Sequence, residues 1–286
     1  MQTIARLDPL RSAVSLLRGD GKVALVPTMG ALHEGHLTLV REAKKLAAHV
    51  IVSIFVNPRQ FGAGEDLDAY PRQLEADCAL LRAEGTSLVW APEPSAMYPE
   101  GYATNISVAG VSEGLCGGDR PGHFDGVATV VCKLFNQVMP DLALFGEKDW
   151  QQLAVIRRMA RDLDLTRPLA DNIIGVPTVR EADGLAMSSR NAYLSADERA
   201  KAAALPRAMH EAIAAIEGGA PVAKSLAKLE TALAAAGFLK VEYAELRHAE
   251  TLAPLDTLGE HPARLLVAAR IGKARLIDNM PVEAKP

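Results

Sequence analysis

The stretch that most constrains the fold is Met29-Gly30-Ala31-Leu32-His33-Glu34-Gly35-His36. It follows the apolar run 23–26 and leads into the helix-like pattern 37–44. Glycines let the backbone turn tightly and approach a ligand closely. A helix N-terminus offers unpaired N–H groups and the positive end of its dipole, which suit phosphate. The stretch therefore predicts a strand, a turn and a helix that hold a triphosphate.

Apolar runs and amphipathic patterns alternate up to Pro177, which is typical of βα units around a mainly parallel sheet. The runs are almost continuously apolar, as expected for strands covered by helices on both faces. We expect strands at 23–26, 50–56, 87–90, 142–145 and 172–176, and helices at 35–47, 67–84, 126–138 and 150–163.

The pattern changes after Pro177. Two alanine-rich segments, 195–217 and 221–236, predict helices, and three short apolar runs at 239–246, 264–269 and 274–277 predict strands. The fold class is therefore α/β, with a parallel-sheet domain at 1–177 and a smaller α+β domain at 178–286. The glycine-rich segment 110–120 is expected to be an ordered surface loop.

Bulk composition excludes several classes. A net charge of −4 with scattered acids and bases argues against a nucleic-acid partner, which requires a basic stripe. Charges interrupt every apolar stretch, so no membrane span is expected. Residues 1–11 lack an apolar signal core, so export is not expected either. The three cysteines, Cys78, Cys116 and Cys132, form neither a CxxC pair nor a disulfide framework, which favours free thiols in a reducing compartment.

His33 and His36 are the first candidates for chemistry. If both lie in the first helical turn they point to one side, where imidazoles can donate hydrogen bonds to a triphosphate. A surface pair and a metal half-site are the alternatives, although the spacing is not that of the HExxH zinc proteases. We assign no metal ligand. The chain has no Walker loop, and no GxGxxG follows its first strand, which disfavours P-loop kinases and NAD enzymes.

Three further polar clusters follow apolar strands, where ligands gather in open α/β sheets. Lys148 suits phosphate, and Asp149 suits ribose or Mg²⁺. The segment 183–190 carries small residues, two hydroxyls and an arginine fit to clamp a polyphosphate. Asn57 and Gln60 end another strand. Singly, each has an ordinary explanation: a solvated lysine, a serine cap, or a glutamine that satisfies backbone groups.

The residues of these clusters match a known family. The chain closely resembles the pantothenate synthetase (pantoate–β-alanine ligase) family. The matching runs span nearly the whole chain in family order, which makes them far more specific than the HxGH element alone. They are VPTMGALHEGH (26–36), SIFVNPRQF (53–61), DLDAYPR (66–72), RPGHFDGV (120–127), FGEKDWQQL (145–153), VPTVREADGLAMSSRN (176–191) and LLVAARIG (265–272).

The resemblance implies that ATP and (R)-pantoate form pantoyl-adenylate and pyrophosphate with Mg²⁺, and that β-alanine then displaces AMP. It also implies a Rossmann-like N-terminal domain that binds the nucleotide and pantoate, a smaller C-terminal lid domain and a cytoplasmic homodimer. It makes His36 the proton donor and places Gln60 against pantoate and β-alanine, and Gln152 against pantoate. His33, Lys148 and Arg190 complete the catalytic set. The ATP contacts it implies are Met29, Gly30, Ala31, Leu32, His33, Glu34, Gly35, His36, Gly146, Glu147, Lys148, Asp149, Val179, Met187, Ser188, Ser189 and Arg190.

One departure is visible, because Arg59 stands where the family usually has Met. We expect it to be turned away from the pocket. Two rival functions remain at this stage. Another HxGH nucleotidyltransferase would leave the nucleotide on its product, and a regulatory module would bind ATP without releasing pyrophosphate.

Overall fold

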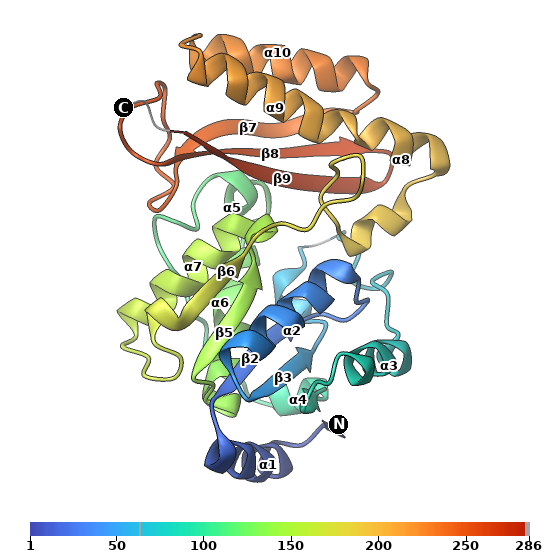
Figure 1. The fold of residues 1–286 in the computed structure, drawn as a ribbon, viewed down its shortest axis with the longest axis vertical. Coiled ribbons are helices and arrows are strands. Elements are labelled where there is room, and N and C mark those ends of the chain that lie inside the picture. Colours follow the sequence, from blue (N-terminus) through green and yellow to red (C-terminus); the bar gives the residue numbers. More distant parts are fainter. Residues whose placement is uncertain (63, 284–286) are drawn as a thin grey trace. The chain divides into compact units, whose positions relative to one another are not determined.

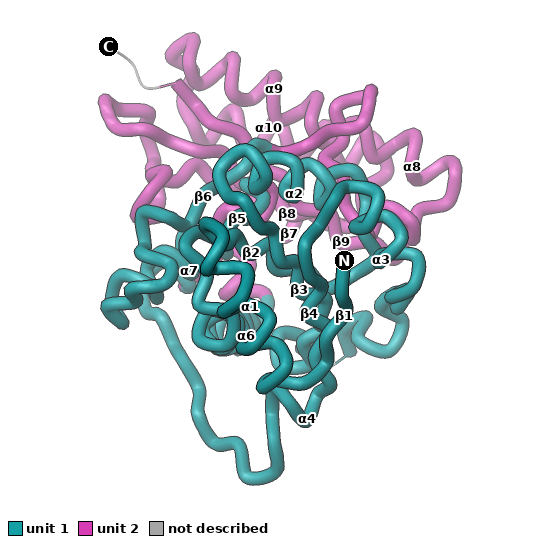
Figure 2. Tube along the Cα trace, turned by 60° about the horizontal axis from the view of Figure 1, so that its bottom comes forward, with its two compact units in different colours: residues 1–112, 120–147, 152–177 teal, residues 113–119, 148–151, 178–286 magenta. Residues whose placement is uncertain are grey.

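The computed structural model describes residues 1–62 and 64–283. These form two compact units, which Figure 2 shows in different colours. Unit 1 consists of residues 1–112, 120–147 and 152–177, and unit 2 of residues 113–119, 148–151 and 178–286. The parallel sheet lies in unit 1 and an antiparallel sheet in unit 2.

Unit 1 is built on a six-stranded sheet with the order β1-β4-β3-β2-β5-β6, in which every pair is parallel. Figure 1 labels β2, β3, β5 and β6 of this sheet. The central strands are mostly apolar and buried, which confirms the α/β expectation. The strands are β1 (Gln2–Ile4), β2 (Val23–Thr28), β3 (His49–Ile54), β4 (Leu88–Trp90), β5 (Leu142–Gly146) and β6 (Ile173–Val176).

The helices of this unit are α1 (Leu7–Asp20), α2 (Glu34–Leu46), α3 (Leu74–Ala83), α4 (Pro94–Met97), α6 (His123–Val138) and most of α7 (Trp150–Asp162). The sequence patterns missed β1 and α1, because β1 has three residues and α1 exposes most of its surface. The helix expected at 67–84 begins only at Leu74, and Pro71 disfavours helical backbone at the residue before it, Tyr70.

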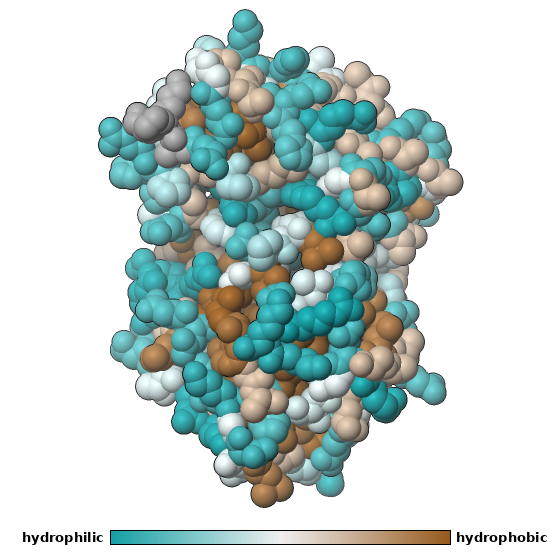
Figure 3. Space-filling view, in the orientation of Figure 1, coloured by the Kyte–Doolittle hydropathy of each residue, from teal (hydrophilic) through white to brown (hydrophobic). Residues whose placement is uncertain are grey.

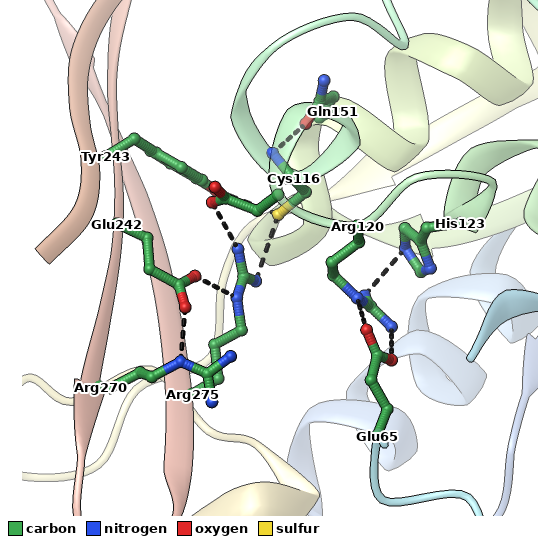
Figure 4. Close-up of polar contacts among 10 residues, drawn as sticks. Glu65, Cys116, Arg120, His123, Gln151, Glu242, Tyr243, Arg270 and Arg275 are labelled. Carbon is green, nitrogen blue, oxygen red and sulfur yellow. Dashed lines mark hydrogen bonds and ion pairs between the residues drawn. The ribbon is translucent and has the colours of Figure 1, made fainter. Parts of the chain in front are cut away.

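Two short segments group with unit 2 although their flanks belong to unit 1. In the first, α5 (Leu115–Asp119) buries Leu115 and Cys116, and the Cys116 Sγ lies 3.1 Å from the Tyr243 Oη and 3.4 Å from Arg275 (Figure 4). The expected surface loop therefore contains a partly buried helix. In the second segment, the Trp150 indole donates to the Ala249 carbonyl over 2.8 Å. All three cysteines are buried free thiols.

Unit 2 carries the antiparallel sheet β7 (Lys240–His248), β8 (Ala263–Ile271) and β9 (Ala274–Val282). The helices α9 (Ala204–Glu217) and α10 (Val222–Ala235) cover one face of this sheet (Figure 1). Their apolar stripes bury Met209, Leu229 and Leu233 with the strand residues. The segment expected as one helix at 195–217 is divided at Ala203 into α8 (Ala196–Ala202) and α9.

Across residues 1–62 and 64–283, no helix is both long and apolar enough to cross a membrane. Hydrophilic side chains cover much of the face drawn in Figure 3, with apolar side chains between them. The division of the chain into domains at 1–177 and 178–286 stays a prediction. The boundary between the two compact units also falls after Pro177, apart from the two short segments described above.

Candidate functional site

The turn between β2 and α2, residues 29–36, is named the phosphate turn here. Gly30 has φ +85° and Ala31 has φ +50°, so two successive residues take the left-handed conformation. A Cβ at Gly30 would lie 3.0 Å from the Asp77 Oδ2 and 3.2 Å from Ile54, so glycine is required both for its conformation and for space.

Asp77 on α3 holds this turn in place. Its side chain is 1% exposed and accepts the backbone N–H of Ala31 over 3.0 Å and that of Leu32 over 2.9 Å. The Gln73 side-chain amide donates to the same carboxylate over 3.3 Å. Two backbone donors are thus fixed by an acid 45 or 46 residues further along the chain. The sequence analysis did not single out Asp77.

The two histidines of the turn lie side by side, with ring centroids 4.1 Å apart. His33 is the N-cap of α2 rather than part of its first turn, and its Nδ1 accepts the Gly35 N–H over 3.1 Å. The His36 Nδ1 accepts the His33 N–H over 3.3 Å in return. Because both Nδ1 atoms accept, each neutral ring carries its proton on Nε2. The turn thus provides two Nε2–H donors at a helix N-terminus.

Gln60 ends the short 3₁₀ helix η1 (Pro58–Gln60), which follows β3. Its Nε2 donates to the Met29 Sδ over 2.9 Å, and its Oε1 accepts from the Asn57 side chain over 3.2 Å. The structure therefore brings Gln60 against the start of the phosphate turn. Helix α6 packs closely on η1, since a Cβ at Gly126 would lie 2.2 Å from the Arg59 carbonyl oxygen.

The ion pair between Arg120 and Glu65, which Figure 4 shows, also fixes the backbone of Gln60. Arg120 donates to both carboxylate oxygens of Glu65, over 2.7 and 2.5 Å, and to the Gln60 carbonyl over 3.1 Å. The His123 Nδ1 lies 2.8 Å from the same carbonyl. Burial raises the pKa of the Glu65 carboxyl, but the hydrogen bond and charge of Arg120 outweigh burial and leave it lowered.

Lys148 and Asp149 follow β5 in the 3₁₀ helix η2 (Glu147–Asp149). The Lys148 Nζ lies 3.6 Å from the Asp149 Oδ1, and the lysine side chain is 19% exposed. Within unit 2, the Asn279 side chain donates to the Lys148 carbonyl over 2.8 Å, while Arg264 contacts Asn279 and stacks 3.5 Å from the Trp150 ring centroid. These contacts fix the backbone that carries the lysine.

The segment 179–190 of unit 2 is named the clamp loop here. It forms a narrow hairpin, in which Met187 donates to the Val179 carbonyl over 3.0 Å. Arg180 forms a bidentate ion pair with the buried Asp278 over 2.7 and 2.9 Å. The Ser188 hydroxyl accepts the Arg190 N–H over 3.3 Å and caps the 3₁₀ helix η4 (Ser189–Tyr193). A serine cap, which was the ordinary alternative, is therefore present.

The expected site residues thus fall into two sets. Unit 1 holds Met29–His36, Gln60, Gly146, Glu147 and Gln152, and unit 2 holds Lys148, Asp149, Val179 and Met187–Arg190. Within unit 1, the structure brings Gln60 into direct contact with Met29, the first residue of the phosphate turn. On the described residues, no group of three or more histidine, cysteine or acidic side chains is arranged to hold a metal ion.

A glycine turn that carries an HxGH element at a helix N-terminus, on a parallel sheet in a chain that also forms a small α+β unit, is typical of nucleotide-binding α/β enzymes. The chain belongs to the pantoate–β-alanine ligase family, whose model matches residues 2–281.

Similar proteins carry the corresponding name. The chain is 71% identical to the pantothenate synthetase of Novosphingobium aromaticivorans over 99% of each chain, and 59% identical to that of Sphingopyxis alaskensis over 99% of this chain and 100% of that one. The crystal structure of pantothenate synthetase from Thermus thermophilus is 48% identical, with a TM-score of 0.91 over 99% of each chain. A Francisella tularensis ligase, crystallised with β,γ-ATP and β-alanine, is 32% identical with a TM-score of 0.83, over 100% of this chain and 99% of that chain.

Proposed function

We propose that this ligase joins pantoate to β-alanine in two steps on one site. Pantoate attacks the α-phosphate of ATP, which gives pantoyl-adenylate and releases pyrophosphate. The β-alanine amine then attacks the acyl carbon, which gives pantothenate and AMP. Family membership supports the overall ligation, and the pair of Nε2–H donors at the phosphate turn is the observation that carries the adenylate step.

The first step needs charge compensation more than it needs a base. The pantoate carboxylate is already anionic, so the barrier comes from its repulsion by the triphosphate and from its placement in line with the α-phosphate. The Nε2–H groups of His33 and His36 are preorganised by their capping bonds, so they can donate to phosphate oxygens without reorganisation. We assign to His36 the role of proton donor in this step.

ATP is assigned to the residues expected from the sequence, on the resemblance. In unit 1 these are Met29–His36 with Gly146 and Glu147, and in unit 2 they are Lys148, Asp149, Val179 and Met187–Arg190. Lys148 and Arg190 add positive charge, and the arginine presents a planar fork that suits phosphate oxygens. Gln60 and Gln152 are assigned to pantoate, with Gln60 also near β-alanine.

Mg²⁺ is proposed to arrive with ATP. The described residues offer no cluster of three or more ligands, which suits a cation held mainly by phosphate oxygens and water with one or two carboxylates. Asp149, which is 45% exposed, can supply one such carboxylate. When bound, the cation would neutralise charge on the triphosphate.

Three further assignments rest on the resemblance alone: a cytoplasmic location, a homodimer, and the role of the C-terminal unit as a lid. The base that deprotonates the β-alanine ammonium is left unassigned.

The experiment that tests the proposed function is a product analysis. With ATP, Mg²⁺ and pantoate, pyrophosphate should be released, and turnover to AMP and pantothenate should require β-alanine. Release of ADP would overturn the adenylate mechanism. Lys148→Ala should lose adenylate formation while remaining folded, and near-normal activity of that variant would remove Lys148 from the mechanism.

A further inference from the structure

Two adjacent residues in the middle of β9, Asp278 and Asn279, are polar and almost fully buried. They are 2% and 4% exposed. Burial of a polar group is unfavourable unless the group finds a hydrogen-bond partner, so the partners of these two residues indicate their role. For both residues, the partners lie in segments of unit 2 that are proposed to bind ATP.

Asp278 connects β9 to the clamp loop. Its carboxylate accepts two hydrogen bonds from Arg180, and the same guanidinium donates to the Gly184 carbonyl across the loop over 3.0 Å. The Asp278 Oδ1 also accepts the backbone N–H of Asn279 over 2.7 Å. β9 further contacts η4, the 3₁₀ helix that contains Arg190. The clamp loop and the helix that follows it are therefore both fixed to β9.

Asn279 connects the same strand to Lys148. Its Nδ2 donates to the Lys148 carbonyl, and its Oδ1 accepts from the Arg264 guanidinium, which stacks on the Trp150 ring. A carbonyl can only accept and a guanidinium can only donate, so the amide has one possible orientation. The Trp150 indole in turn donates to the Ala249 carbonyl. These contacts explain why the lysine groups with unit 2, although it follows a strand of unit 1.

We propose that Asp278 and Asn279 are positioning residues for ATP, which hold the clamp loop and Lys148 in a common arrangement on one strand. This inference rests on the proposed function and refines it, because that function assigns Lys148 and Arg190 to ATP separately. Asn279 acts through the Lys148 backbone, and Asp278 acts through its ion pair with the loop. Cations that are fixed before ATP arrives cost less to order on binding. The two residues therefore act on affinity for the polyphosphate of ATP rather than for its adenosine.

Substitution of Asn279 tests this inference by titration calorimetry of ATP with Mg²⁺ in the absence of pantoate, where no adenylate can form. Asn279→Ala removes the donor to Lys148 without adding charge, and Asn279→Asp removes it while keeping an acceptor for Arg264. Both should raise the Kd for ATP about threefold to tenfold and leave the Kd for adenosine unchanged. An unchanged Kd for ATP, an equal rise for adenosine, or a rise confined to Asn279→Asp would overturn the inference.

Asn172→Asp is the matched control, since the Asn172 amide also donates to a backbone carbonyl, that of Asp141, over 3.0 Å. Asn172 lies in the 3₁₀ helix η3 (Ala170–Asn172) of unit 1 and has no part in the proposed ATP site. This variant should bind ATP like wild type, whatever stability it loses in urea. An equal rise in the Kd for ATP in Asn172→Asp and Asn279→Asp would mean that Asn279 acts only through general stability.

A double-mutant cycle with Lys148 separates positioning from a structural role. Lys148→Met keeps an unbranched side chain and removes the ammonium group, so Asn279→Ala should weaken ATP binding no further in that background. The same fold-change in both backgrounds would mean that Asn279 does not act through Lys148, which would overturn the inference.

The failure of this inference is distinguishable from that of the proposed function. Wild-type protein that releases no pyrophosphate with ATP and pantoate refutes the function itself, and Lys148→Met that binds ATP like wild type removes Lys148 from the ATP site. Wild-type protein that makes pantothenate, with Asn279→Asp equal to Asn172→Asp in its Kd for ATP, refutes only the positioning role.

Discussion

The phosphate turn of unit 1 and the clamp loop of unit 2 are both irregular backbone, yet they are fixed by different means. The phosphate turn is held by neutral N–H groups that donate to one buried carboxylate, Asp77. The clamp loop is held by pairs of opposite charge, Arg180 with Asp278 and Asp183 with Arg199. Backbone donors on a buried acceptor give a rigid geometry, whereas partly exposed ion pairs are weaker and depend on salt and pH.

This comparison implies a division of work between the two segments. In the proposed mechanism the phosphate turn places two imidazole donors, and transition-state stabilisation depends strongly on geometry. In the same proposal the clamp loop supplies hydroxyls and an arginine, whose flexible side chains tolerate a less rigid backbone. We therefore expect changes in the turn to act mainly on kcat and changes in the loop to act mainly on the KM for ATP.

The largest effect is expected for His36→Ala. Removal of one preorganised donor typically lowers kcat by about 10²–10³. The readout is the rate of pantoate-dependent pyrophosphate release, and the matched control is His210→Ala, which removes an exposed histidine from α9. A kcat within a few-fold of the control would mean that the turn does not contribute to the chemistry. The expectation that changes in the turn act mainly on kcat would then be wrong.

Asp77→Ala should have the next largest effect. It leaves the N–H groups of Ala31 and Leu32 without their acceptor, and each unsatisfied buried donor costs about 1–3 kcal/mol. We expect lower stability in urea and a fall in kcat larger than any change in the KM for ATP. Asp77→Asn, which retains one acceptor oxygen, should be intermediate.

Glu75→Ala is the control for Asp77, because it removes an exposed acid from the first turn of the same helix. If Asp77→Ala matches Glu75→Ala in both stability and kcat, then the turn does not depend on the buried carboxylate.

Asp278→Ala tests the clamp loop in the same way. The variant leaves the Arg180 guanidinium without its bidentate partner, but that side chain is 24% exposed and can regain water. The loss of stability should therefore fall below the about 3–5 kcal/mol seen when a fully buried pair is broken. The KM for ATP should rise while kcat changes little. A stability loss with an unchanged KM would remove the loop from the ATP site.

The same contrast explains what the sequence could and could not predict. The phosphate turn and the strands around it follow from local patterns, since apolar runs, glycines and a helix start lie within a few residues of each other. Asp77 was missed because its partners lie 45 and 46 residues away, and a single acid in an amphipathic helix looks like a solvated charge. Asn279 was missed for the same reason, since its partner Lys148 is 131 residues distant.

The helix boundaries in the two units differ from expectation for a related reason. The split at Ala203 between α8 and α9 has a visible signal in Pro206, which lies in the first turn of α9, because a proline lacks the N–H for the helical bond to residue 202 and its ring clashes with that carbonyl. The prediction of one continuous helix followed the alanine-rich propensity and passed over this proline. Likewise, α5 has only five residues, too few for a periodic pattern, and its burial depends on Tyr243 and Arg275 from the far end of the chain.

The smallest effect is expected for the exposed pair Asp183 and Arg199, and it separates the two means of fixing a segment most directly. The pair should stabilise unit 2 by less than about 1 kcal/mol, because both side chains are partly exposed. The hydrogen bond from Arg199 lowers the pKa of Asp183 from its ordinary value of 3.8. A lowered pKa stabilises the folded state above that ordinary value, and the contribution is lost as the pH falls through the folded pKa.

The measurement is the free energy of unfolding of wild type and Asp183→Asn from pH 7 to pH 3, at low salt and at roughly 1 M salt, where charges are screened within about 3 Å. The difference between the two proteins should shrink in acid and in salt, whereas the difference between wild type and Asp77→Ala at pH 7 should persist in salt. Equal salt sensitivity of the two differences would mean that the turn and the loop are held by the same kind of force.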